Sequence, residues 1–387
     1  MRRWQPASRA LMAGNFAIGC GVMVVPGALN DISQSLAVSP AVAGQLITAG
    51  AVAMGTGAPL LAAAFARWDR RQLLTLALGW YAVGHALCAL MPDYAALLPL
   101  RALSVLGAAV FTPQAAAAIS VLAPPEQRGR AITSIFLGWS ISSVLGMPMH
   151  SYIGEAFGWR WAFLMVALLA SLAALGVWRT LPGGIRPPAL SLAQWKSALT
   201  NPLLMGMVAV TALSAAGQFT LFSYFSPYYR QALGASAAQV SFLFFWFGAF
   251  GLLGNVLVSR HIDRLGAARA VNLALMAMTV SLLLWPFTGG HGVALMAAVL
   301  VPWALGGFAC NSAQQARLSQ AGGVVAPALL ALNTSAIYMG QAAGAGGGGV
   351  LLAAGGFAPL PWAALAWMSA ALALSLWAAR RMRAAHA

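Results

Sequence analysis

Three ionisable side chains lie inside long apolar stretches of this sequence and are the residues best suited to chemistry. Arg101 follows the run LLPL, His85 lies within YAVGHALCAL, and His150 follows GMPM. A charge inside hydrocarbon costs at least about 2.5–3.5 kcal/mol on insertion scales, so each group needs a partner or a function. Histidine titrates near neutral pH and can relay a proton, whereas burial would leave it a neutral hydrogen-bonding group. These residue types indicate proton transfer or charge pairing.

The acidic residues lie elsewhere in the chain. All six fall at the ends of apolar stretches or between them, namely Asp31, Asp69, Asp93, Glu126, Glu155 and Asp263. A carboxylate in a low dielectric can alternate between binding a proton and binding a substrate, and the sequence provides none at mid-membrane depth. Proton coupling would then run through Asp31 as the counter-charge of Arg101, or through a histidine. The alternative for Arg101 is structural, with its long side chain extending to the membrane surface.

Twelve apolar stretches must position these side chains. Apolar residues make up 61% of the 387 residues and charged residues only 7%, against about 25% charged residues in soluble proteins. A helix that crosses about 30 Å of hydrocarbon needs about 20 mostly apolar residues. We therefore predict an all-α membrane protein with 12 transmembrane helices in two six-helix bundles, at approximately residues 9–30, 40–64, 72–91, 95–121, 130–152, 159–181, 200–228, 237–259, 270–289, 292–317, 326–352 and 359–379.

Positive charge is confined largely to alternate gaps between these stretches. The net charge is +15, and with the N-terminus inside, the basic residues other than Arg101, Arg160 and Arg230 fall in cytoplasmic segments. This bias orients membrane proteins, so it predicts that both termini are cytoplasmic, and it explains the surplus without nucleic acid. The excess of Arg over Lys, with abundant Ala and Gly, is typical of a GC-rich bacterium. We expect a multi-pass protein of the bacterial inner (cytoplasmic) membrane.

The sequence contains no catalytic constellation. The three cysteines, Cys20, Cys88 and Cys310, lie within apolar stretches and lack metal-type spacing. A Gly-rich phosphate loop, a helical His-Glu metal motif and a nucleophile elbow are all absent from the sequence. We expect no enzyme activity, no metal and no cofactor.

A polar interruption divides the chain into two halves. Residues 182–200 contain Pro and Gly residues that break helices, and are predicted to link an N-terminal six-helix bundle (1–181) to a C-terminal one (201–387) on the cytoplasmic side. The halves echo each other at an offset near 200 residues, since Thr133-Ser134 corresponds to Thr334-Ser335 and Pro26 to Pro227. Such repeats place a central site between two moving halves in several transporter folds. Alternatively, any two apolar helical halves look alike.

Four motifs follow one another in a recognisable order. They read LAPPEQRGRAI (122–132), VLGMPMHSYIGEAFGWRWAF (144–163), AAGQFTLFSYFSPYY (215–229) and LNTSAIYMGQAAGA (332–345). Together they resemble the major facilitator superfamily, specifically the drug:proton antiporter-1 group near the arabinose efflux permeases. The chain departs from that family at its first inner loop, where Ala66 replaces an acidic residue and Asp69 a glycine. Its Gly-Pro signature is also loosened to Gly146-Met147-Pro148.

The resemblance implies a monomeric secondary transporter that exports a small solute by alternating access in exchange for protons. Arg101 resembles an arginine that the family uses in coupling, so Asp31, Arg101 and His150 are the predicted coupling residues. His85 would be structural, because stretch 72–91 is peripheral in that family. Two alternatives stay open: a uniporter or facilitator without proton coupling, and a transport-inactive receptor or scaffold.

The resemblance also implies a central cavity and two inner gates. Stretches 9–30, 95–121, 200–228 and 292–317 line the cavity in that family, and 130–152 borders it. The predicted cavity residues offer amides, aromatic rings and other neutral groups, which suit a neutral or weakly polar solute such as a sugar, nucleoside or drug: Asn15, Met23, Phe111, Gln114, His150, Gln218, Phe222, Trp303, Asn311, Gln314, Tyr338 and Gln341. For each amide, hydrogen bonding between helices, worth about 0.6 kcal/mol per pair, is an equal alternative.

The predicted gating loops contain the charged residues Arg67, Asp69, Arg70, Arg71, Asp263 and Arg264. Their positive charges are explained equally by membrane topology. In stretch 326–352, Gly340, Gly344 and the run 346–349 indicate close helix packing, with a gating hinge as the less direct interpretation.

Overall fold

The computed structural model describes residues 4–124, 127–186, 192–289 and 291–384. Every regular element in these ranges is a helix, and ten segments are long and apolar enough to cross a membrane. One of them, Gly292–Gly355, is 64 residues long and contains two long α-helices, Gly292–Gly322 and Ala326–Gly355. The predicted all-helical membrane architecture is therefore confirmed, while the number of twelve spans stays a prediction.

The helices fall into two compact units. Unit 1 consists of Met1–Ser39 and Ala49–Ala189, and unit 2 of Pro40–Thr48 and Leu190–Ala387. Within the predicted linker 182–200, α9 spans Leu192–Thr200, and residues 187–191 lie outside the described residues. The division into bundles 1–181 and 201–387 stays a prediction.

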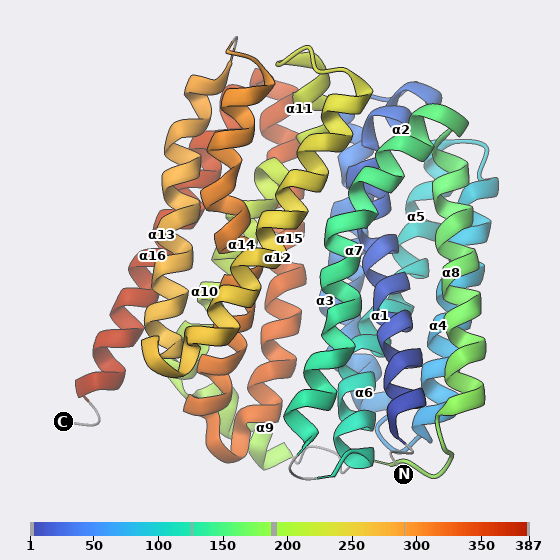
Figure 1. Ribbon diagram of the computed structural model, residues 1–387, viewed down its shortest axis with the longest axis vertical. Helices are drawn as coiled ribbons and strands as arrows, with labels where there is room; N and C mark the ends of the chain where they lie inside the picture. The colour runs from blue at the N-terminus through green and yellow to red at the C-terminus, as the bar shows by residue number, and fades with distance from the viewer. Residues whose placement is uncertain (1–3, 125–126, 187–191, 290, 385–387) are drawn as a thin grey trace. The chain divides into compact units, whose positions relative to one another are not determined.

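In unit 1, α1 packs against α6, α7 and α8, while α4 packs against α6 and α8 (Figure 1). Apolar residues at nearly every position allow a helix to be buried on several sides, and α1 is buried along most of its length. The helices associated with this unit are α1 (Trp4–Gly27), α2 (Leu29–Ser35), most of α3 (Pro40–Ala64), α4 (Arg70–Leu90), α5 (Tyr94–Ser104), α6 (Leu106–Leu122), α7 (Arg128–Phe157) and α8 (Trp159–Thr180).

In unit 2, α10 packs against α15 and α16, and α14 packs against α12 and α13 (Figure 1). Its helices are α9, α10 (Pro202–Phe222), α11 (Phe225–Gln231), α12 (Ala237–Leu265), α13 (Ala267–Leu284), the 3-10 turn η2 (Trp285–Thr288), α14 (Gly292–Gly322), the 3-10 turn η3 (Gly323–Val325), α15 (Ala326–Gly355) and α16 (Leu360–Ala384). The N-terminus of α12 is fixed by a capping box, in which Ser236 and Gln239 satisfy each other's backbone N–H groups.

Three stretches predicted as single helices are interrupted in the structure. The breaks lie at Ala28 between α1 and α2, at Val105 between α5 and α6, and at Ser223 and Tyr224 between α10 and α11. Pro26 lies just before the first break, and proline weakens a helix because it removes a backbone donor and crowds the preceding turn. The breaks do not end the apolar stretches, so hydropathy alone does not reveal them.

The two units repeat the same close helix contacts. A methyl group on Gly107 of α6 would lie 2.5 Å from the Ala77 carbonyl oxygen of α4, and one on Gly306 of α14 would lie 2.6 Å from that of Ala274 in α13. Both glycines thus allow two backbones to touch. The shift between the pairs is close to the 200-residue offset seen in the sequence, so the repeat extends to packing.

Candidate functional site

Arg101 lies at the centre of a buried polar cluster in unit 1. Only 3% of its surface is exposed, and helix α5 directs its guanidinium towards α1 and α4. Its Nη2 donates to the Gly21 carbonyl oxygen over 2.7 Å, and its Nη1 lies 2.8 Å from Nε2 of His85. A guanidinium can only donate, so Nε2 of His85 must be the acceptor.

The second ring nitrogen of His85 fixes its tautomer. Nδ1 lies 2.8 Å from the Tyr81 carbonyl oxygen, one helical turn earlier in α4. A carbonyl oxygen only accepts, so Nδ1 carries the proton and the ring is neutral. The ring also lies between aromatic neighbours, with centroids 4.1 Å from Tyr81 and 5.7 Å from Phe163. His85 is therefore a neutral acceptor held in place for Arg101.

His150 contacts α1 next to the arginine site. The side chain is fully buried, and Nε2 lies 2.8 Å from the carbonyl oxygen of Cys20, the residue before Gly21. Within the described residues, Nδ1 has no hydrogen-bond partner. Two adjacent carbonyl groups of α1 thus anchor Arg101 and His150.

Asp31, the predicted counter-charge, lies at a different contact. A methyl group on Gly154 of α7 would lie 2.6 Å from its carboxylate, whereas the hydrogen bonds found for Arg101 go to His85 and Gly21. The sequence interpretation of His85 as a structural residue missed its pairing with Arg101. The available signal was chemical, because each of the two was an ionisable residue in an apolar stretch without an obvious partner.

The other predicted cavity residues of unit 1 are mostly engaged within the helix bundle. Asn15 donates to the Ile135 carbonyl oxygen over 3.3 Å and accepts from Thr112 over 2.8 Å, so it joins α1 to α7 and α6. Met23 and Phe111 are buried, and Gln114 is half-buried. The contacts of Asn15 are those of the interhelical alternative.

In unit 2, Phe222 and Trp303 belong to an aromatic cluster. Phe225 stacks on Trp285 with centroids 5.3 Å apart and meets Trp303 edge-on at 5.3 Å. Phe222 lies 5.3 Å from Phe225 and extends the cluster. The indole Nε1 groups of Trp285 and Trp303 are buried and, in the described part of the chain, unpartnered. The cluster therefore retains hydrogen-bond donors within an apolar environment.

The remaining predicted cavity residues of unit 2 are mostly amides. Gln314 is buried and donates to the Met207 carbonyl oxygen over 2.5 Å, while its Oε1 has no partner among the described residues. Gln218 is half-buried and donates to Ser214 over 3.3 Å. Tyr338 and Gln341 are buried in α15, and Asn311 is exposed on α14, where it accepts from Gln315 over 3.4 Å. Whether these residues contact a solute stays a prediction.

The first predicted gating loop forms a well-bonded turn. Asp69 caps α4 by accepting from the backbone N–H groups of Arg71 and Gln72 over 3.0 and 3.3 Å, and it also accepts from that of Gly184. Arg70 donates to the carbonyl oxygens of Phe65, Ala66 and Trp68 in the turn that follows α3. Of the second loop, Arg264 is exposed at the end of α12, and the Asp263 side chain lies outside the described residues.

The sequence matches that of a known family. A family model described as "Major Facilitator Superfamily" matches residues 11–326. The chain belongs to the Major Facilitator Superfamily. This family is one of transporters, so the chain is a membrane transporter rather than an enzyme, and the buried cluster around Arg101 lies in a transporter bundle.

Relatives within the Major Facilitator Superfamily cover most of the chain. The "Inner membrane transport protein YdhP" of Escherichia coli (strain K12) is 28% identical and covers 96% of this chain and 95% of its own. The "Chloramphenicol resistance protein" of Streptomyces lividans is 31% identical, and the match covers 85% of this chain and 84% of the relative. The crystal structure of the human organic anion transporter MFSD10 (TETRAN) superposes with a TM-score of 0.74 at 16% identity, and covers 97% and 99%. That likeness concerns the fold alone.

Proposed function

We propose that this protein exports a small neutral or weakly polar solute across the bacterial inner membrane by alternating access, in exchange for protons. Twelve spans and two cytoplasmic termini complete the proposal. Membership of the Major Facilitator Superfamily and the efflux-type relative named for chloramphenicol resistance support it. The sugar-like, nucleoside-like and drug-like solute classes follow from the neutral amides and aromatic rings of the predicted cavity residues.

The observation that carries proton coupling is the hydrogen bond between Arg101 and His85. The hydrogen bond is accepted by the lone pair of His85 Nε2. A proton that bound to His85 would add to this same lone pair. Protonation there would replace an attractive hydrogen bond by two adjacent cations, and repulsion is strong in a low dielectric. A proton on His85 would therefore displace Arg101 from its present position. Proton binding could in this way change the conformation of the helix bundle.

The residues next to the Arg101–His85 pair are further candidates for a part in proton coupling. Tyr81 of α4 and Phe163 of α8 pack around the His85 ring, and His150 of α7 lies beside the Gly21 anchor. His150 has a free Nδ1 among the described contacts, so it is the second candidate for the proton. Asp31 stays the third, as a charge partner reached after a rearrangement.

Transport in proteoliposomes tests this proposal. We expect an imposed pH gradient to drive uphill movement of a labelled solute, with chloramphenicol as the first probe and a panel of sugars and nucleosides beside it. Arg101→Ala and His85→Phe should each abolish the gradient-driven accumulation while leaving downhill exchange measurable, because the cavity residues are intact. The His150→Gln variant shows which of the two histidines binds the proton, because coupling through His85 should persist in it.

The alternatives predict different results. Flux that ignores the pH gradient would identify a uniporter or facilitator. Equal accumulation with and without the protein, across the whole panel, would favour a receptor or scaffold and would refute the transport proposal.

A further inference from the structure

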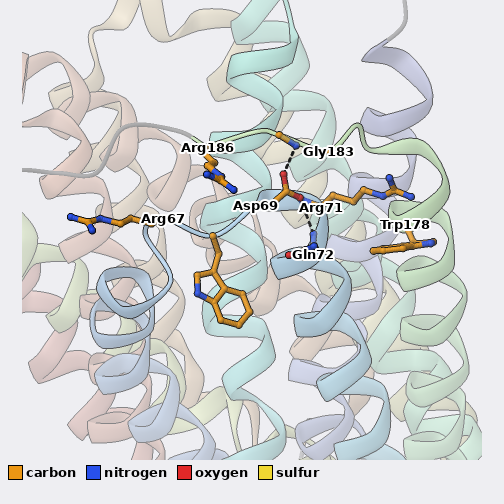
Figure 2. Close-up of a pocket in the computed structure, with 9 residues that line it drawn as sticks. Arg67, Asp69, Arg71, Gln72, Trp178, Gly183 and Arg186 are labelled. Carbon is orange, nitrogen blue, oxygen red and sulfur yellow. Dashed lines mark hydrogen bonds between the residues drawn. The ribbon is translucent and has the colours of Figure 1, made fainter.

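A pocket of about 510 Å³ opens in unit 1, away from the Arg101 cluster. It lies where the turn between α3 and α4 meets the end of α8 and the segment that follows it. Figure 2 shows Arg186 next to Asp69, with Arg71 extending to Trp178 on one side and Arg67 on the other. The lining is Arg67, Trp68, Asp69, Arg71, Gln72, Trp178, Gly183, Gly184 and Arg186.

Two charged residues form the framework of this pocket. Asp69 uses both carboxylate oxygens to accept from the backbone N–H groups of Arg71, Gln72 and Gly184. Arg70 is buried, donates to three carbonyl oxygens of the preceding turn, and its own N–H donates to the Ile185 carbonyl oxygen over 3.0 Å. The charge of Asp69 is thus already engaged by donors of the backbone.

Three guanidinium groups of the lining are not engaged in this way. For Arg67, Arg71 and Arg186, no side-chain hydrogen bond or ion pair to another described residue is found. Arg71 lies over the Trp178 ring at 4.2 Å from its centroid, which holds the guanidinium in place, and its buried Nε has no partner in the described ranges. Arg67 and Arg186 are exposed. The pocket therefore contains three guanidinium groups available for a ligand and one carboxylate that is already hydrogen-bonded to the backbone.

The location of the pocket identifies the kind of ligand. Helices α3, α4 and α8 are long and apolar enough to span a membrane, so their ends lie at the membrane–water boundary. Trp68 and Trp178 are exposed there, as expected of residues in an interfacial aromatic belt. Basic pockets at such boundaries bind anionic lipid head groups, and arginine matches phosphate oxygens in a bidentate geometry.

We propose that this pocket binds the phosphate group of an anionic phospholipid, through Arg67, Arg71 and Arg186. The tryptophans at the rim favour a lipid over a dissolved phosphate, because they provide an interfacial surface for the glycerol and upper acyl region. Bound lipid would tie the α3–α4 turn to the segment after α8 and stabilise the fold of this end of unit 1. The site makes no use of the transported solute and so stands apart from the proposed function.

Lipid titration of the purified full-length protein tests the site. We expect native mass spectrometry to show tighter binding of phosphatidylglycerol than of phosphatidylcholine. In the Arg67→Gln/Arg186→Gln double variant, phosphatidylglycerol affinity should fall at least about tenfold, because two charge-assisted hydrogen-bonding groups are lost. Both side chains are exposed and unpaired in the described structure, so the variant should keep the wild-type melting temperature in lipid-free detergent. Arg179→Gln, an exposed arginine on α8 outside the lining, should bind like the wild type.

Each other outcome overturns the proposal. Unchanged phosphatidylglycerol affinity in the double variant would exclude the pocket, and an equal loss in Arg179→Gln would show a general charge effect. Inorganic phosphate that competes at the same concentration as the lipid would assign the site to a soluble anion instead.

Discussion

Arg101 is a buried cation that is hydrogen-bonded to uncharged groups. The stability of the fold therefore depends on each of these acceptors. His85→Phe would keep the ring packing against Tyr81 and Phe163 but remove the acceptor for Nη1. We expect the free energy of unfolding to fall by about 1–3 kcal/mol, because a buried donor would lose its partner. His85→Gln, which retains a side-chain acceptor, should lose clearly less. Thermal unfolding in detergent measures the difference, and equal melting temperatures for the two variants would contradict this role.

At the scale of helices, the glycines of α15 decide how closely two helices pack. Gly340, Gly344 and Gly348 lie on one face of α15 and touch α10 at the carbonyl oxygens of Ala212, Ala216 and Thr220. A methyl group at any of them would collide with backbone, which cannot move without shifting a helix. From the sequence, these glycines are interpreted either as sites of close helix packing or as a gating hinge, and the contacts show the packing directly.

The run of glycines supplies its own matched control. Gly344→Ala would place a methyl group against the Ala216 carbonyl oxygen, whereas Gly347→Ala would meet nothing within 4 Å. Overpacking costs about 1–3 kcal/mol, so we expect a lower melting temperature for Gly344→Ala. Gly347→Ala should be neutral or slightly stabilising, because alanine is the better helix former. A higher melting temperature for Gly344→Ala would show that the contact is not tight.

The helices were more predictable from the sequence than the contacts of the site. Apolar length alone located the helices, because hydrocarbon requires continuous stretches. It could not locate the break at Val105, which leaves hydropathy unchanged. The Arg101–His85 pair was also missed, since the residues lie on different helices and only packing brings them together. Asp69, predicted as part of a gate, has the local position of a helix cap, which Asp before a helical stretch already indicates.

At the scale of the whole molecule, the distribution of arginines predicts the orientation in the membrane. The turn at Gly266 is flanked by Arg264 and Arg269, whereas the turn at Gly234 follows only Arg230. We expect green fluorescent protein fused to the C-terminus to fluoresce, as it does in the cytoplasm. Alkaline phosphatase should be active when fused after Gly234 and inactive after Gly266. The reverse pattern at the two turns would invert the proposed topology.

The neutral surroundings of Arg101 have an electrostatic consequence for selectivity. A fixed positive charge without a carboxylate in the apolar stretches raises the local potential inside unit 1. A cationic solute that approached this region would be repelled, because buried surroundings of low dielectric screen the field only weakly. We therefore expect a lipophilic ammonium compound to be transported less well than a neutral solute of the same size.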